Sequence, residues 1–171
     1  MEPMSLIGNY LRITPSELRR LIEQPATLVD LLTRVLDSED GDVPADGRWL
    51  EIDEAWQGIH FLLTGRPTGG RRPLADAVLG GTPIGEELGY GPARYLDPKQ
   101  VKSVAHALAK LDEEEFRSRF DAEKLRSAGI YPCSWDNGED DIDYLADYYT
   151  QLVDFFRQAA EAGDAMLMWV D

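Results

Sequence analysis

The chain has 171 residues, with 32 acidic and 17 basic side chains, so its formal net charge is −15. Hydrophobic residues make up 43% of it, which excludes an intrinsically disordered chain. No apolar run reaches the roughly 18 residues of a membrane-spanning helix. The negative charge repels phosphate backbones and anionic lipids, so we expect neither nucleic acid nor membrane as a partner. The missing secretion signal and the single cysteine predict a cytoplasmic protein.

The first third of the chain predicts one strand followed by helices. Polar and apolar side chains alternate within residues 6–13, which favours a strand. Thr14, Pro15 and Glu17 have the spacing of a capping box, which marks the start of a helix. Apolar residues at helical spacing continue through residues 25–36. The acidic run that follows, 37–42, is expected to form a solvated loop.

The densest apolar and aromatic block of the sequence lies at residues 48–65. We expect it to form a central helix, with Asp53 as its N-cap and Gly65 as its C-terminal stop. Residues 66–73 are rich in glycine, proline and arginine and are predicted to form a loop. A short helix is expected at 74–79.

The second half predicts further helices and a closing strand. Glycines punctuate residues 85–92, which lead into a short strand or extended segment at 94–96. Asp97 is expected to cap the next helix. The last helix is predicted at about 142–162, and the apolar run 165–170 is predicted to form a buried strand. The pattern indicates an α+β fold: a single domain with a small mixed sheet, which includes adjacent N- and C-terminal strands, covered by several helices.

Six segments carry a family resemblance that covers nearly the whole chain. The most specific are 53–65, which reads DEAWQGIHFLLTG, and 89–96, which reads GYGPARYL. The others are 6–10, 73–81, 130–132 and 155–163. Together they resemble the YfbM-like family of uncharacterised bacterial proteins. The resemblance implies a single α+β domain spanning 1–171 in a soluble bacterial protein, and it implies no reaction.

Two of these segments suggest a pocket. Trp56 and His60 lie one helical turn apart, so their side chains share a face, and His60 is a candidate general base or hydrogen-bonding group. The glycines around Tyr90 permit close backbone approach, and Arg94 beside aromatic residues suits a planar anion. If the two segments meet, they and Trp135 are expected to line one pocket. Alternatively, His60 is a paired core histidine and Arg94 is a structural clamp for helix C-termini.

A second hypothesis concerns the basic cluster formed by Arg66, Arg71 and Arg72. Glycines at 65 and 70 give the spacing of a phosphate loop, but arginines replace its lysine and its hydroxyl residue, and a helix precedes it. We therefore do not assign a phosphate loop. The three arginines are candidates for holding a carboxylate or phosphate, with pairing to the acidic loops as the alternative interpretation.

Other chemical signals are weaker. Cys133 is either one half of a Cys–His dyad with His60 or a buried inert thiol. His106 lies off the apolar stripe of its helix and is expected on the surface. The acidic runs around Gly41 and Gly138 fail the calcium-loop register. We expect no metal and no cofactor.

Two specific functions remain open, beside a housekeeping fold whose role the sequence does not reveal. The charge of −15 and the lack of a catalytic set favour an acidic protein that binds a basic protein partner, in the manner of a toxin-neutralising protein. The acidity is greater in the second half of the chain, which would attract such a partner. The alternative is a small-molecule binder or hydrolase that uses the Trp/His/Tyr/Arg pocket. The oligomeric state is left open.

Overall fold

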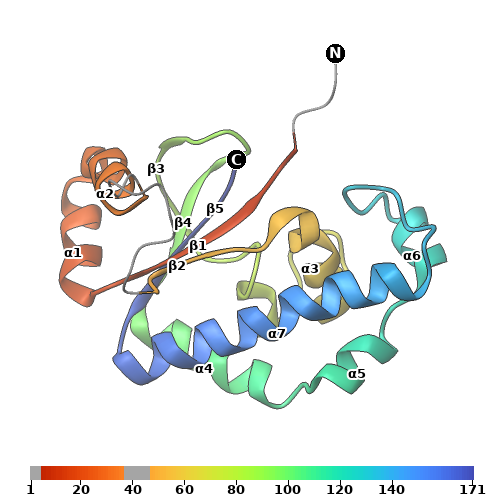
Figure 1. Ribbon diagram of the computed structural model, residues 1–171. Coiled ribbons are helices and arrows are strands. Elements are labelled where there is room, and N and C mark those ends of the chain that lie inside the picture. Colours follow the sequence, from red (N-terminus) through yellow and green to blue (C-terminus); the bar gives the residue numbers. More distant parts are fainter. Residues whose placement is uncertain (1–4, 37–46) are drawn as a thin grey trace.

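The computed structural model describes residues 5–36 and 47–171, so the predicted acidic loop at 37–42 lies outside the described residues. A five-stranded sheet forms the middle of the molecule, in the order β2-β1-β5-β4-β3 (Figure 1). Its strands are β1 (Gly8–Ile13), β2 (Trp49–Glu51), β3 (Thr82–Glu87), β4 (Pro92–Leu96) and β5 (Ala165–Val170). All neighbouring pairs are antiparallel. The α+β fold is confirmed, but the sheet is antiparallel rather than mixed.

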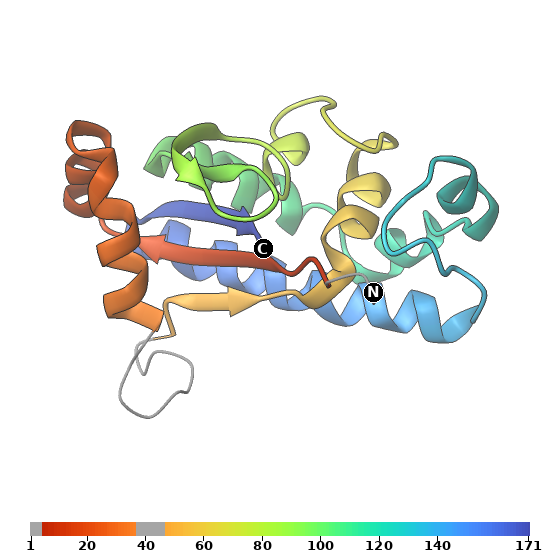
Figure 2. The same cartoon turned by 90° about the horizontal axis from the view of Figure 1, so that it is seen from above.

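The N- and C-terminal strands pair at the centre of the sheet, as predicted. Gly8 of β1 pairs with Val170 of β5, and the register continues to Ile13 opposite Ala165. Figure 2 shows these two strands side by side, with β2 on the outer side of β1. All six residues of β5 are buried. An unbroken apolar strand is the pattern expected where both faces of a sheet are covered.

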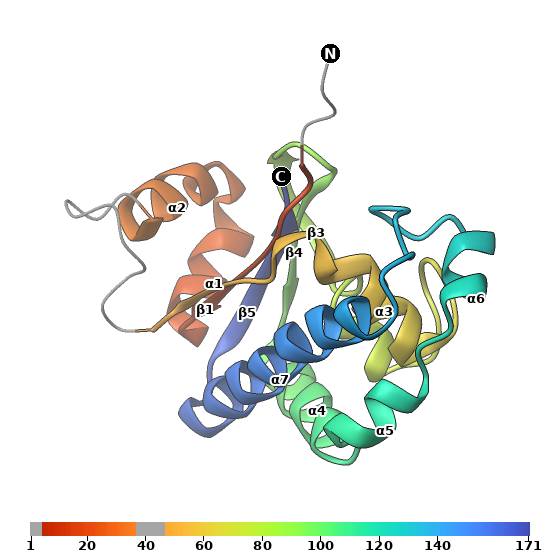
Figure 3. The same ribbon diagram turned by 45° about the vertical axis from the view of Figure 1, so that its right-hand side comes forward.

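Helices cover both faces of the sheet (Figure 3). The helices α1 (Pro15–Glu23) and α2 (Leu28–Leu36) pack on one face, where Leu167 and Trp169 of β5 join their core. Met166 and Met168 belong to the larger core on the other face. That side holds α3 (Trp56–Thr64), α4 (Pro98–Ala109), α5 (Glu113–Ser118), α6 (Ala122–Ser127) and α7 (Glu139–Ala162).

The two edge strands were not predicted from the sequence. In β3 only Ile84 is buried, and its neighbours Pro83 and Gly85 are poor strand formers. The β3–β4 register also shifts between Ile84 and Glu87. Proline and an irregular register are common at sheet edges because they discourage pairing with another chain. The strand is therefore defined by its neighbour β4 and carries little alternation of its own.

The apolar block 48–65, in which a helix capped by Asp53 was predicted, divides into three elements. Its first residues form β2, Asp53–Ala55 form a 3-10 turn, and α3 begins only at Trp56. Asp53 does not cap a helix; its carboxylate accepts a hydrogen bond of 2.6 Å from the hydroxyl of Tyr144. Gly65 does end α3, in the left-handed conformation with φ of 76°. The expected helix at 74–79 is only a 3-10 turn, Leu74–Asp76.

Within residues 5–36 and 47–171, no helix has the length and apolar character needed to cross a bilayer.

Candidate functional site

The tryptophan-bearing helix and the glycine-rich segment meet. The rings of Trp56 and Tyr90 lie 5.6 Å apart at a tilt of 48°. On its other side Trp56 stacks on Tyr131 at 5.5 Å, and its indole nitrogen donates to the carbonyl of Leu6 at 2.9 Å. Trp56 is only 2% exposed, whereas Tyr90 is 55% exposed. Tyr90 therefore covers a tryptophan that belongs to the core.

His60 is fully buried in α3. Its Nε2 lies 2.8 Å from the carbonyl oxygen of Gly69, and because a carbonyl only accepts, Nε2 carries the hydrogen. Nδ1 is then unprotonated, and it has no hydrogen-bond partner among the described residues. Burial, and to a smaller extent the positive charge of Arg94, lower the pKa of His60, against a raising contribution from the Gly69 bond. The side chain is thus held neutral.

Arg94 acts as a clamp on nearby carbonyl groups. Its Nη1 donates to the carbonyls of Val78 and Gly80, each at 2.8 Å. The hydroxyl of Tyr10 donates to the adjacent carbonyl of Ala77 at 2.6 Å. Burial raises the pKa of Tyr10, so this hydroxyl stays protonated and neutral. Together, Tyr10 and Arg94 hold the segment that leads from the 3-10 turn into β3.

None of the cavities described below is lined by more than one of the five predicted pocket residues. Only Trp135 lines one, a cavity of about 280 Å³ beside Asp53 and Tyr144. Trp135 is 2% exposed and packs against Phe120, with ring centroids 6.3 Å apart, and against the backbone of Gly58. Trp56, His60 and Trp135 are all core residues, and Arg94 is engaged with carbonyl groups. The sequence could place the two segments in contact, but it could not show that the contact is densely packed.

Cys133 is exposed, not buried as one interpretation of the sequence held. Its thiol donates to the carbonyl of Gly129 at 3.7 Å, whereas His60 bonds to Gly69 and is fully buried. The structure therefore does not join the two residues in a dyad. Among the described residues, no group of three or more His, Cys, Asp or Glu side chains is arranged to hold a metal ion.

A cavity of about 690 Å³ lies between the C-terminal end of α3, the loop after it, α4 and α5. This volume is within the range of small-molecule sites. We call it the basic cavity. It is lined by Leu63, Thr64, Arg71, Arg72, Pro73, Leu74, Ser103, His106, Ala107, Lys110, Leu111, Glu115 and Arg119. Four of the 17 lysine and arginine side chains of the protein line it, against one carboxylate, which concentrates positive charge in a strongly acidic chain.

Two of the four cations of the basic cavity are unpaired. Among the described residues, Arg71 and Lys110 have no side-chain hydrogen bond or ion pair, and both are exposed. The alternative, pairing with the acidic loops, is not seen for Arg71 or Arg72 among the described residues; the Nε of Arg72 lies 3.6 Å from Asp76, which belongs to the neighbouring 3-10 turn. Arg119 lies 3.6 Å from Glu115. The cavity therefore contains N–H donors of Arg71 and Lys110 that are available to an anion.

The arginine-bearing loop is fixed to α3 by several hydrogen bonds. His60 holds the carbonyl of Gly69, and the amide of Gln57 donates to the carbonyl of Pro67 at 3.2 Å. Thr64 Oγ1 accepts from the backbone nitrogen of Arg66 at 3.1 Å. Gly70, at φ of 119°, packs so closely on Thr64 that an added Cβ would lie 2.9 Å from it. These contacts position Arg71 and Arg72 at the cavity.

Arg66 has a different position from its two neighbours. It is exposed at the beginning of the loop, where its carbonyl accepts from Thr64, and it does not line the basic cavity. The predicted trio of anion-binding arginines is thus reduced to Arg71 and Arg72 at this site.

The contribution of α4 to this site was not predicted from the sequence. Ser103, His106 and Lys110 follow one another at intervals of three and four, which places them on one face of the helix. His106 is exposed, as predicted, but it faces a cavity. The spacing of these polar residues could have been recognised in the sequence. Their position opposite Arg71 depends on the tertiary structure.

A model of a domain of unknown function (DUF1877) matches residues 4–169. The chain belongs to this family. It is 28% identical over 132 residues to Protein YfbM of Escherichia coli (strain K12), covering 75% of this chain and 74% of that protein. The crystal structure of YfbM from Escherichia coli, described as a protein of unknown function, is also similar, with a TM-score of 0.71. That match covers 96% of this chain and 99% of the other; at 24% identity it shows the shared fold. The predicted YfbM-like membership is therefore confirmed.

Proposed function

We propose that this DUF1877 protein binds a small organic anion in the basic cavity. The observation that carries the proposal is the convergence of Arg71, Arg72, Lys110 and Arg119 on one space of about 690 Å³. The guanidinium group of arginine and the ammonium group of lysine are the usual partners of carboxylates and phosphates. Because Arg71 and Lys110 have no other side-chain partner among the described residues, an anion would not have to displace an existing ion pair to reach them.

The walls of the cavity suggest what else the ligand contains. Leu63, Pro73, Leu74 and Leu111 contribute apolar surface, and Thr64 and Ser103 contribute hydroxyl groups. A ligand with an apolar body would gain about 0.8 kcal/mol for each buried methylene group. We therefore expect a longer carboxylate such as hexanoate to bind more tightly than acetate or inorganic phosphate.

The proposal is tested by titrating the protein with hexanoate, acetate and inorganic phosphate at constant ionic strength, followed by two-dimensional NMR. The double variant Arg71→Gln and Lys110→Gln should weaken hexanoate binding at least tenfold, because each charge-assisted bond contributes about 1.5–3 kcal/mol. Both side chains are exposed, so the variant should fold normally.

The control is the double variant Arg19→Gln and Lys102→Gln, which removes the same charge from exposed positions that do not line the cavity. It should bind hexanoate as the parent protein does. Equal affinities of the two double variants, or no binding by the parent protein at millimolar hexanoate, would reject the proposal.

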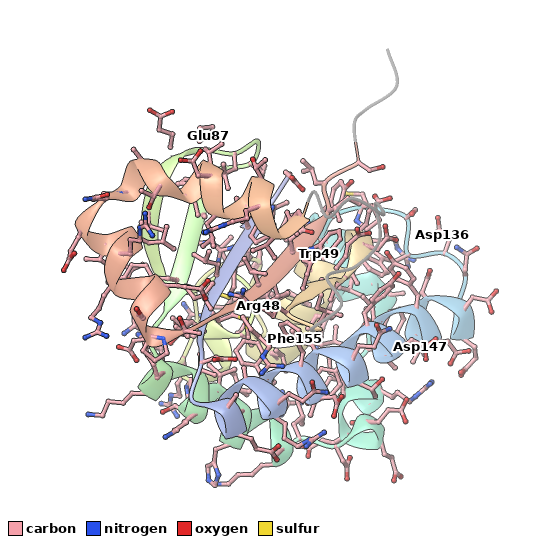
Figure 4. The ribbon with its side chains drawn as sticks, turned by 60° about the vertical axis from the view of Figure 1, so that its left-hand side comes forward. Arg48, Trp49, Glu87, Asp136, Asp147 and Phe155 are labelled. Atoms are coloured by element: carbon pink, nitrogen blue, oxygen red, sulfur yellow. The ribbon has the colours of Figure 1, made fainter. Side chains whose placement is uncertain are left out.

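A second candidate function is the binding of a basic protein partner. It is supported by α7, which carries seven carboxylates and one arginine, four of the carboxylates in its first five residues. Figure 4 shows Asp136 and Asp147 on the outer surface near this end of α7. A nearby cavity of about 280 Å³ is lined by Asp53, Glu54 and Asp141, which suits a lysine or arginine side chain.

This candidate predicts that a specific basic protein is captured at low salt and that its affinity falls steeply as salt rises. Once identified, its binding is measured with the triple variant Glu139→Gln, Asp140→Asn and Asp147→Asn, which should weaken it at least tenfold. Neutralising exposed Glu23, Asp30 and Glu86 instead removes equal charge away from α7 and should have little effect. Equal losses in both variants would indicate a non-specific charge effect and reject the candidate.

A further inference from the structure

A second cavity adjoins the basic cavity. It has a volume of about 540 Å³ and lies between the C-terminal end of α3, the segment after α5, and α6. The two cavities share Leu63, Thr64 and Arg119 as lining residues. They therefore lie on either side of a common wall, at the end of α3.

Arg119 is the charged group in that wall. Its Nη1 donates to the carbonyls of Leu62 at 3.1 Å and Leu63 at 3.4 Å, so the guanidinium caps the last turn of α3. The side chain remains 37% exposed, and Nη2 lies 3.6 Å from Glu115. Arg119 is thus held in place by the helix while part of it faces solvent where the cavities meet.

The second cavity has its own cation. Lys124, in the first turn of α6, lines it, is exposed, and has no side-chain partner among the described residues. The carboxylate of Asp121, which also lines this cavity, accepts from the backbone nitrogen of Lys124 at 3.2 Å and so caps the helix. Phe61 and Phe120, both half-buried, add apolar surface to the lining of this cavity.

We infer, on the basis of the proposed anion site, that its ligand carries two anionic groups joined by an apolar spacer. One group binds to Arg71 and Lys110 in the basic cavity, the spacer crosses the wall beside Arg119, and the second group binds to Lys124. The shared chemistry is an elongated dianion, either a dicarboxylate or a bisphosphate. When two ends are linked, the second binds at a raised effective concentration, so a dianion gains affinity over a matched monoanion.

The test compares dianions with monoanions of equal length at constant ionic strength by NMR titration. The carboxylate arm uses adipate against hexanoate and suberate against octanoate; the phosphate arm uses the bisphosphate of hexanediol against hexyl phosphate. In at least one arm the dianion should bind about tenfold more tightly than its monoanion. Lys124→Gln should abolish that gain and leave monoanion binding unchanged. The control Lys102→Gln, at an exposed position that lines neither cavity, should leave both the gain and monoanion binding unchanged.

The outcomes separate this inference from the proposed function. If monoanions bind and Arg71→Gln weakens them, but no dianion binds more tightly, the two-ended ligand is rejected and the anion site stands. A dianion gain that survives Lys124→Gln also rejects the inference. If neither class binds to the parent protein, both proposals fail.

Discussion

At the scale of single residues, His60 is the most constrained polar side chain of the core. It is fully buried, donates through Nε2 to Gly69, and leaves Nδ1 without a partner among the described residues. A proton on Nδ1 would add a charge to the interior, near the guanidinium of Arg94. Folding therefore favours the neutral ring. The hydrogen bond to Gly69 links this interior group to the loop that carries Arg71.

This environment predicts an acid-sensitive contribution to stability. Because the pKa of His60 is lowered from its ordinary value of 6.5, the unfolded chain takes up the proton first. The stabilisation of the folded state by the neutral ring is complete above pH 6.5 and is lost as the pH falls below it. The loss in the free energy of unfolding is about 1.4 kcal/mol for each unit by which the pKa is lowered. His60→Gln keeps an amide donor for Gly69 and cannot titrate. Urea unfolding at neutral pH and near about pH 5 should show a smaller loss for this variant than for the parent.

The exposed His106 provides the matched control for that experiment. His106→Gln also removes one histidine, but from an exposed position, so it shows whether the loss of any histidine gives the same change as His60→Gln. If His60→Gln and the parent lose equal stability on acidification, the buried histidine is not the cause.

At the scale of elements, α4 is important because it supplies one wall of the basic cavity and begins at a complete capping box. Asp97 Oδ1 accepts from the backbone nitrogen of Gln100 at 2.8 Å, and Gln100 Oε1 accepts from the backbone nitrogen of Asp97 at 2.9 Å. Val101, Val104 and Leu108 bury the opposite face against the core. The cap therefore fixes where the helix begins and which residues face Arg71.

Asp97→Ala should lower the free energy of unfolding by about 1 kcal/mol, because the backbone nitrogen of Gln100 at the helix start loses its side-chain acceptor. Asp97→Asn retains a side-chain oxygen that accepts from Gln100 and should cost much less. Urea denaturation of both variants measures the difference. Equal losses for alanine and asparagine would show that the negative charge, and not the capping bond, provides the stabilisation.

At the scale of the whole molecule, local signals predicted two helix starts and the central strands. The caps at Thr14 and Asp97 and the apolar run of β5 depend on residues close together in sequence, and the structure confirms each of them. The edge strands were missed because β2 is three residues long and β3 buries only Ile84. Their conformation comes from pairing with β1 and β4, which a local pattern does not encode.

The candidate site was predicted only in part, for a similar reason. Arg71 and Arg72 stand out as a basic cluster in an acidic sequence, but Lys110 and Arg119 come from other helices and join them only in the folded chain. Conversely, Trp56 and His60 attracted a functional interpretation because they are distinctive residue types. Their near-complete burial is set by side chains distant in sequence and cannot be deduced from spacing.

The pairing of β1 with β5 has a consequence for synthesis in the cell. Tyr10 lies opposite Met168, so more than 150 residues separate two neighbours in the middle of the sheet. A nascent chain emerging from the ribosome exposes the β5-facing edge of β1 long before β5 exists, and β4 likewise waits for β5. The two halves of the sheet are therefore joined only by the last strand to be made. Until β5 has been released, the growing polypeptide can form local helices and the β1–β2 and β3–β4 pairs, but it cannot join those pairs into one sheet.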